Sequence, residues 1–270
     1  MICFWYIAEA CIGIKTKTGE NIIALFYGFG IINNWHRYQL FTHLFVQRRH
    51  NMANRPVFMV SLDNKFCNRE DTEFEFFSGF SDKQKKKCIC SLHNEFLKKN
   101  NGKRVLEISS KSEDMLGVNL SAFNLMTKTS DGMECSVESA FQAGKVFENG
   151  GPYTDLLYVS SKAAKKDERL KNSGRIISFV FDGMEFQTKP ETYFYNWLYI
   201  NALNWQEDLA LQVLGYDAFT DIEFNPKKSI NCQAEAAAIF VSLKRQGLLE
   251  VALEDKEKFK EIVYLKSREG

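Results

Sequence analysis

The stretch Ser136–Leu156, SVESAFQAGKVFENGGPYTDL, places an acid and an amine among apolar and small residues. An α-helix turns about 100° per residue, so Glu138, Gln142 and Lys145 share one face if the whole segment is helical. About 10 Å of axial rise then separates Glu138 from Lys145, which is too far for a direct ion pair. The pattern predicts either a solvated polar stripe or a pocket wall that presents a carboxylate, an amide and an amine.

The composition is that of an ordinary globular protein and indicates no particular class of partner. The 270 residues are 45% apolar and 26% charged, with a formal net charge of +1. The seven cysteines form no C-x-x-C pair, and the four histidines form no paired ligand motif. This pattern predicts no metal site and no cofactor. Scattered thiols are typical of the reducing cytoplasm. No nucleotide-binding loop, dinucleotide fingerprint or serine-hydrolase elbow is present.

The first fifty residues differ from the rest. MICFWYIAEACIGI lacks the basic start of a signal peptide, and NIIALFYGFGII is too short to span a bilayer as a helix. NMANRPVFMV, from Asn51, reads like an ordinary start followed by a strand. We therefore expect a working domain at 52–270 and no stable membrane association. Residues 1–51 would be a poorly ordered extension or a mis-assigned start. The alternative is an arm that docks on a membrane or a partner.

The remaining elements predict an α+β fold, a predominantly helical single domain with a small sheet. Strand patterns occur at 55–62 and 103–109, and Asp182-Gly183 is typical of the turn of a hairpin over 176–188. Predicted helices cover 82–99, a short segment after 112, 189–205, 207–216 and 232–249. Residues 217–231 are predicted to form a long irregular loop, of the length that is typical of binding loops.

Three groups of polar residues are candidates for a site. One is the opening stretch, and another is SAFN at Ser121–Asn124. The third is the loop Asp217–Asn231, for which a solvated turn before the last long helix is the alternative. Arg175 in NSGR offers a bidentate clamp for an anion, although most such dipeptides are surface turns.

Basic residues gather in two further places. One group is Lys83, Lys85, Lys86 and Lys87, and the other is Lys162, Lys165, Lys166, Arg169 and Lys171. Solvated helix faces are one interpretation of these groups. A footprint for nucleic-acid phosphates is the other.

The motif ESAFQAGKVF resembles the pattern E-x-x-(F/Y)-Q-A-x-K-F of the NADAR family, with one extra Val before Phe147. SAFNLM is similar to that family's serine–asparagine–phenylalanine segment, with Phe and Asn exchanged in order. DAFTDIEFNPKKSINCQ stands where the family has an Asp-rich loop that ends in an Asn. Here Ile222-Glu223-Phe224 replaces its tryptophan–glycine signature, which indicates a divergent branch. The resemblance covers roughly 55–249 and implies the NADAR fold.

More closely, these segments resemble the NADAR antitoxins that are encoded beside DarT-type toxins. The resemblance implies a partner toxin that ADP-ribosylates guanine in DNA. It also implies that this chain is an N-glycosidase that hydrolyses ADP-ribose from the modified guanine. Two alternatives stay open. One is a non-catalytic module that binds ADP-ribose or blocks the toxin, and the other is a glycosidase of a small nucleotide-like metabolite.

For that reaction the candidate catalytic residues are Glu138 and Lys145. Glu138 would stabilise the positively charged sugar or activate water. Lys145 would attack the anomeric carbon and form a Schiff base. The sequence does not choose between these two routes. The candidate substrate-binding residues are Asp217, Asp221 and Asn231 for ribose hydroxyls, Arg175 for pyrophosphate, Phe123 and Tyr153 for ring stacking, and also Ser121, Asn124 and Gln142.

Overall fold

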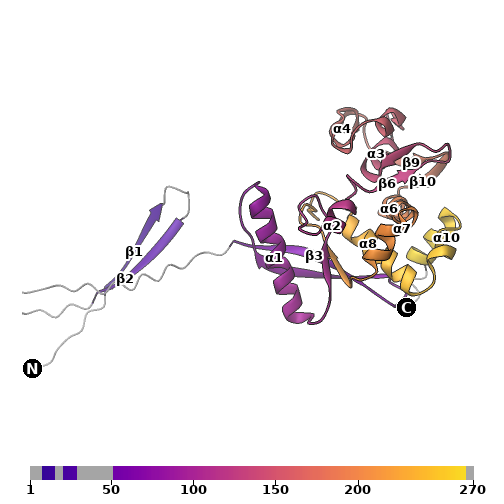
Figure 1. The fold of residues 1–270 in the computed structure, drawn as a ribbon. Helices are drawn as coiled ribbons and strands as arrows, with labels where there is room; N and C mark the ends of the chain where they lie inside the picture. Colours follow the sequence, from indigo (N-terminus) through magenta and orange to yellow (C-terminus); the bar gives the residue numbers. More distant parts are fainter. Residues whose placement is uncertain (1–7, 16–20, 29–50, 266–270) are drawn as a thin grey trace, which may run out of the picture. The chain divides into compact units, whose positions relative to one another are not determined.

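The computed structural model describes residues 8–15, 21–28 and 51–265, and the chain divides into two units after Asn51. In the first unit, β1 (Ala8–Lys15) and β2 (Asn21–Gly28) pair as antiparallel strands. The prediction that 1–51 is a poorly ordered extension or a mis-assigned start falls mostly on residues outside the described ranges. The second unit begins at Met52 and contains all the other elements (Figure 1).

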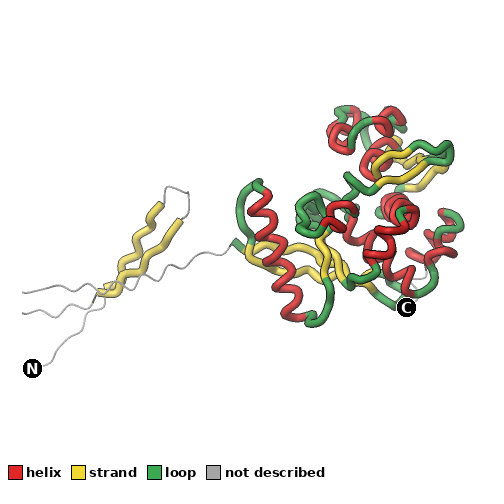
Figure 2. The backbone as a smooth tube through the Cα atoms, in the orientation of Figure 1, coloured by secondary structure: helices red, strands yellow, loops and turns green. Residues whose placement is uncertain are grey.

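A four-stranded sheet of order β4-β3-β11-β5 forms one layer of the second unit. Its strands are β3 (Met52–Val60), β4 (Cys67–Glu75), β5 (Val105–Glu107) and β11 (Ala218–Thr220). Successive residues of a strand point to opposite faces. Accordingly Val57 packs into the cluster beneath α1 (Asp82–Lys99), whereas Phe58 joins the larger core that contains α8 (Gln233–Arg245). Helices therefore cover both faces of this sheet (Figure 2).

The rest of the unit is mainly helical, with two smaller sheets. The hairpin β9 (Ile176–Phe181) and β10 (Met184–Gln187) is extended by β8 (Lys145–Phe147), and β6 (Met126–Lys128) pairs with β7 (Glu134–Ser136). The further helical elements are α2 (Met115–Asn119), α3 (Val137–Ala143), η1 (Thr154–Tyr158), α4 (Ser161–Lys166), α5 (Arg169–Asn172), α6 (Tyr193–Trp205), α7 (Glu207–Val213), α9 (Leu249–Ala252), α10 (Lys256–Lys260) and η2 (Glu261–Leu265). The predicted α+β class, with helices dominating, is confirmed.

One predicted loop is wrong in its first part. The sequence predicts an irregular segment at 217–231, but Ala218–Thr220 form β11 in the interior of the sheet. β11 runs parallel to β5 and antiparallel to β3. Three residues are too few to show an alternating pattern, so tertiary pairing rather than local sequence makes this strand.

One structural finding bears on the expectation of no stable membrane association. In the described part of the chain, no helix has both the length and the apolar composition that a bilayer crossing requires.

Candidate active site

The helix of the opening stretch is shorter than its pattern predicts. The Ser136 side chain caps α3, which ends at Ala143. The Gly144 carbonyl accepts a hydrogen bond from Val180 N at 2.7 Å, and Lys145 then opens β8. A Cβ at position 144 would lie 2.7 Å from the Val180 carbonyl oxygen, so this close crossing requires glycine. The shared helical face from Glu138 to Lys145 is therefore not formed, because pairing with β9 ends the helix at Ala143.

Glu138, Gln142 and Lys145, which we call the polar triad, nevertheless meet. Lys145 Nζ donates a hydrogen bond to Gln142 Oε1 at 2.7 Å, and Gln142 Nε2 donates to Glu138 Oε1 at 2.9 Å. The amide can serve both neighbours in one orientation only, with its oxygen toward the amine and its NH₂ group toward the carboxylate. Glu138 is 5% exposed and Gln142 6%. An acid and an amine are thus joined through one amide, with little contact with water.

The environment of Lys145 makes its amine easier to deprotonate than that of an ordinary lysine. Burial lowers the pKa of Lys145 to about 8, with a further lowering by the Lys165 ammonium and an opposing effect of the Glu138 carboxylate. Its Nζ lies 4.6 Å from the centroid of the Phe141 ring. At pH 7 a pKa near 8 leaves roughly a tenth of these amines neutral, against fewer than about one in a thousand for an ordinary lysine. A neutral amine that donates to Gln142 keeps its lone pair free for attack on an electrophile.

The SAFN segment lies against the start of α3, as expected if the two share a site. Glu138 N donates a hydrogen bond to the Ala122 carbonyl at 2.8 Å. The centroid of the Phe123 ring lies 4.9 Å from Lys165 Nζ. Ser121 is 2% exposed, and its hydroxyl has no hydrogen-bond partner among the described residues. The Asn124 amide instead donates to the Val118 carbonyl at 2.9 Å, an exposed contact that holds the segment's own turn.

Asp221 lies just after β11 and is 9% exposed. Its Oδ1 accepts hydrogen bonds from Glu223 N at 3.0 Å and Phe224 N at 3.1 Å. Burial, and next the nearby Glu107 carboxylate, raise the pKa of Asp221 to about 8. Glu107 is itself buried and accepts hydrogen bonds from Ser109 Oγ, Thr220 Oγ1 and Ile222 N. Asp221 is therefore mostly a neutral acid at pH 7, able to donate a hydrogen bond.

This raised pKa makes a prediction about stability. An unfolded Asp has a pKa of about 3.9, so between about pH 4 and pH 8 unfolding releases a proton, and the free energy of unfolding falls as the pH rises. Asp221→Asn keeps an oxygen for both amides and removes the ionisable group. We expect it to melt above the parent at about pH 7.5, by about 2–4 °C per kcal/mol of penalty removed. Melting curves should show this gap narrowing as the pH falls and closing near about pH 4. A pH-independent gap would contradict the prediction.

Two groups beside the polar triad are not distinguished by the sequence. Lys165 Nζ lies 3.5 Å from Glu138 Oε1, although nothing but a run of lysines marks it in the sequence. Tyr195 lies within the aromatic run of α6 and meets Phe141 edge-on, with ring centroids 5.1 Å apart. Burial, and next the charge of Glu138, hold the pKa of Tyr195 well above its usual value, and Asp221 contributes as well. The Tyr195 hydroxyl therefore stays protonated near both carboxyl groups.

Two other candidates hold contacts of their own. Arg175 Nε and Nη2 donate to Glu148 Oε1 at 2.9 and 2.6 Å, and this ion pair lowers the pKa of Glu148. An anion would have to displace Glu148 from Arg175. The Tyr153 hydroxyl hydrogen-bonds Ser173, and the Arg169 guanidinium lies 4.5 Å from the centroid of the Tyr153 ring. Neither side chain bonds a member of the polar triad.

The two ends of the predicted binding loop differ. Asp217 accepts hydrogen bonds from Arg104 N at 3.0 Å and Arg245 Nη1 at 3.1 Å, and so fastens β5 to the end of α8. At the other end, Asn231 Oδ1 is buried without a partner among the described residues. Buried polar atoms are nearly always paired, so Asn231 and Ser121 are the candidates whose geometry best suits a polar ligand.

The comparisons with known proteins point to one family. A search of the curated proteins finds no match. The family model of the DarT1-associated NADAR antitoxin matches residues 53–269, nearly all of the second unit, and confirms the resemblance that the motifs indicate. The chain therefore belongs to the family of DarT1-associated NADAR antitoxins.

Proposed function

We propose that this chain is an N-glycosidase that removes ADP-ribose from ADP-ribosylated guanine in DNA, and thereby acts as the antitoxin of a DarT-type toxin. The polar triad carries the proposal, because a buried carboxylate is joined through one amide to an amine whose pKa is lowered to about 8. A buried lysine with a lowered pKa is typical of nucleophilic catalysis. The family match supports the antitoxin role.

Removal of ADP-ribose breaks the C–N bond between the anomeric carbon and the base. In the route that we favour, the neutral Lys145 Nζ attacks that carbon, the bonding electron pair moves to the base nitrogen, and the base takes up a proton. The sugar ring then opens to a Schiff base, and water hydrolyses it to free ADP-ribose and the amine. Glu138 would supply and take up the protons. In the other route, Glu138 activates a water molecule that attacks the same carbon.

We propose the Asp221 acid for a hydrogen bond to the substrate, together with the Ser121 and Asn231 side-chain oxygens, which have no hydrogen-bond partner among the described residues. Five other candidates are weaker proposals for substrate binding: Phe123, Asn124, Tyr153, Arg175 and Asp217. All but Phe123 already hold hydrogen bonds of their own.

The test is turnover of an oligonucleotide that carries one ADP-ribosylated guanine, with the full chain and with a chain that begins at Met52. We expect both proteins to release free ADP-ribose and restore guanine, which also tests 52–270 as the working domain. Tight binding without release would indicate a non-catalytic module. Equal turnover of the ADP-ribosylated nucleoside alone would instead favour a glycosidase of small metabolites.

A further inference from the structure

We propose that α4 and the residues directly before it form the surface that binds the DNA strand flanking the modified guanine. The inference rests on the proposed function and adds the surface on which the polymer lies. It also assigns phosphate binding to one of the two lysine groups, which the sequence alone does not distinguish.

Three lysines share one face of α4, because Lys162, Lys165 and Lys166 are three and four positions apart. The middle one reaches the polar triad, with Lys165 Nζ 3.5 Å from Glu138 Oε1. Lys162 and Lys166 are exposed, and neither pairs with a carboxylate anywhere in residues 51–265. Two positive charges without a carboxylate partner in residues 51–265 thus lie on the same short helix as the lysine that contacts Glu138, where they could bind phosphates of the strand.

Exposed aromatic rings accompany these lysines. Tyr158 directly precedes the turn into α4 and is 76% exposed. Phe123 is 37% exposed and lies under Lys165 Nζ, 4.9 Å from it. Surfaces that bind single strands combine cations, which follow the phosphates, with rings on which bases stack. α4 and the residues next to it thus supply both components.

Hydrogen bonds fix this face relative to the polar triad. Ser161 Oγ donates to the Phe123 carbonyl and contacts Ser136 Oγ, both at 2.7 Å. Ser139 Oγ donates to the Val159 carbonyl at 3.1 Å. The start of α4 is therefore held against the start of α3, which carries Glu138, and Figure 1 shows the two helices side by side. A strand bound on α4 would have a defined register with respect to Glu138.

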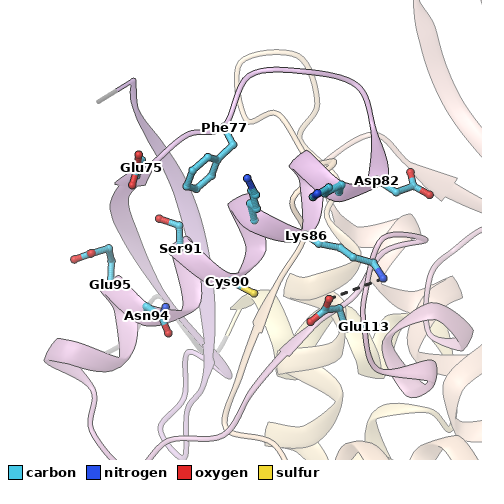
Figure 3. A pocket seen from close by; sticks show the side chains of 11 residues that line it. Glu75, Phe77, Asp82, Lys86, Cys90, Ser91, Asn94, Glu95 and Glu113 are labelled. Atoms are coloured by element: carbon cyan, nitrogen blue, oxygen red, sulfur yellow. Dashed lines mark ion pairs between the residues drawn. The ribbon is translucent and has the colours of Figure 1, made fainter. Parts of the chain in front are cut away.

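The second lysine group, on α1, is a poorer surface for phosphates. Lys85 pairs with Glu223 at 3.0 Å and Lys86 with Glu113 at 3.9 Å. Lys83, Lys86 and Lys87 line an open hollow of about 810 Å³, shown in Figure 3. Four carboxylates also line it: Glu75, Asp82, Glu95 and Glu113. Acids interleaved with lysines would repel the phosphates of a strand. In Figure 1, α1 also lies well apart from α3 and α4.

The experiment measures binding of a fluorescent, unmodified single-stranded oligonucleotide by anisotropy over a series of salt concentrations. It compares the full-length parent with Lys162→Gln/Lys166→Gln and, as a matched control, Lys83→Gln/Lys87→Gln. For single strands, the slope of log affinity against log salt becomes shallower by about 0.7 for each phosphate that the protein no longer neutralises. We expect that flattening and a several-fold weaker affinity at low salt in the α4 variant, and the parental slope in the control.

Parental binding by the α4 variant, or no binding by the parent, would overturn the proposal. Flattening in the control alone would assign the strand to α1 instead. Melting temperatures that match the parent would show that both variants fold. The oligonucleotide carries no ADP-ribose, so its binding does not depend on turnover. A protein that binds through α4 but releases no ADP-ribose from modified DNA would overturn the proposed function and leave this surface standing.

Discussion

Lys145→Ala is expected to lower the rate of ADP-ribose release by at least about 10²-fold, because it removes the nucleophile of the favoured route. Lys145→Arg should be as inactive, since a guanidinium stays protonated and offers no lone pair. Borohydride added during turnover should reduce the Schiff base and link ADP-ribose covalently to the parent protein. Mass spectrometry should find this adduct on Lys145 and in neither variant.

Lys83→Gln is the matched control, because that exposed lysine lies on α1 and belongs neither to the proposed chemistry nor to the proposed DNA-binding surface. It should form the adduct as the parent does. Both Lys145 variants should keep near-parental melting temperatures, since the end of α3 is set by backbone pairing with β9 and not by this side chain. Active Lys145→Ala, or no adduct in an active parent, would refute the nucleophilic route and leave water activation by Glu138.

The pH profile provides a second measure of the same amine. Because the reactive form is the neutral one, the rate should rise with pH, with a midpoint near the pKa of about 8. The Lys165 ammonium helps to lower that pKa, so Lys165→Met should move the midpoint to higher pH. Lys165→Arg keeps the charge and should leave the midpoint near its parental value.

Much of the fold follows from local patterns. α1 occupies the predicted residues 82–99, because Ser81 caps it and the apolar positions recur at helical spacing. The Asp182-Gly183 turn forms as predicted, with φ of 50° and 75° at these residues. The sequence predicts that the helix near Pro190 starts at 189. In the structure this helix, α6, begins at Tyr193, three residues beyond Pro190. These elements are specified by residues that are neighbours in the chain.

The parts that the sequence does not predict depend on distant partners. β11 is a strand because β3 and β5 lie on either side of it, and α3 ends early because β9 supplies a partner for β8. The sequence suggests the polar triad through a continuous helical stripe, which the structure does not form. Its side chains still meet, because Lys145 reaches back to Gln142, three residues earlier. Tyr195 and Glu107 join the site only through tertiary packing, which no local pattern reveals.

Glu138→Gln should reduce release of ADP-ribose by about 10²–10⁴-fold, the usual range for a lost acid–base group. The amide has nearly the same size and keeps an oxygen for Gln142, so the fold and the binding of free ADP-ribose should persist. Calorimetry with ADP-ribose and a melting curve test both expectations. Near-parental turnover would mean that the carboxylate is structural.

The residual activity of Glu138→Gln also has a distinctive pH profile. The Glu138 carboxylate raises the pKa of Lys145, so its removal should move the midpoint below the parental value of about 8. Lys165→Met removes a positive charge and should move the midpoint the opposite way. A general loss of packing would not shift one amine in two directions. Opposite shifts would show that both side chains act on Lys145 through charge, whereas unshifted midpoints would mean that another group limits the rate.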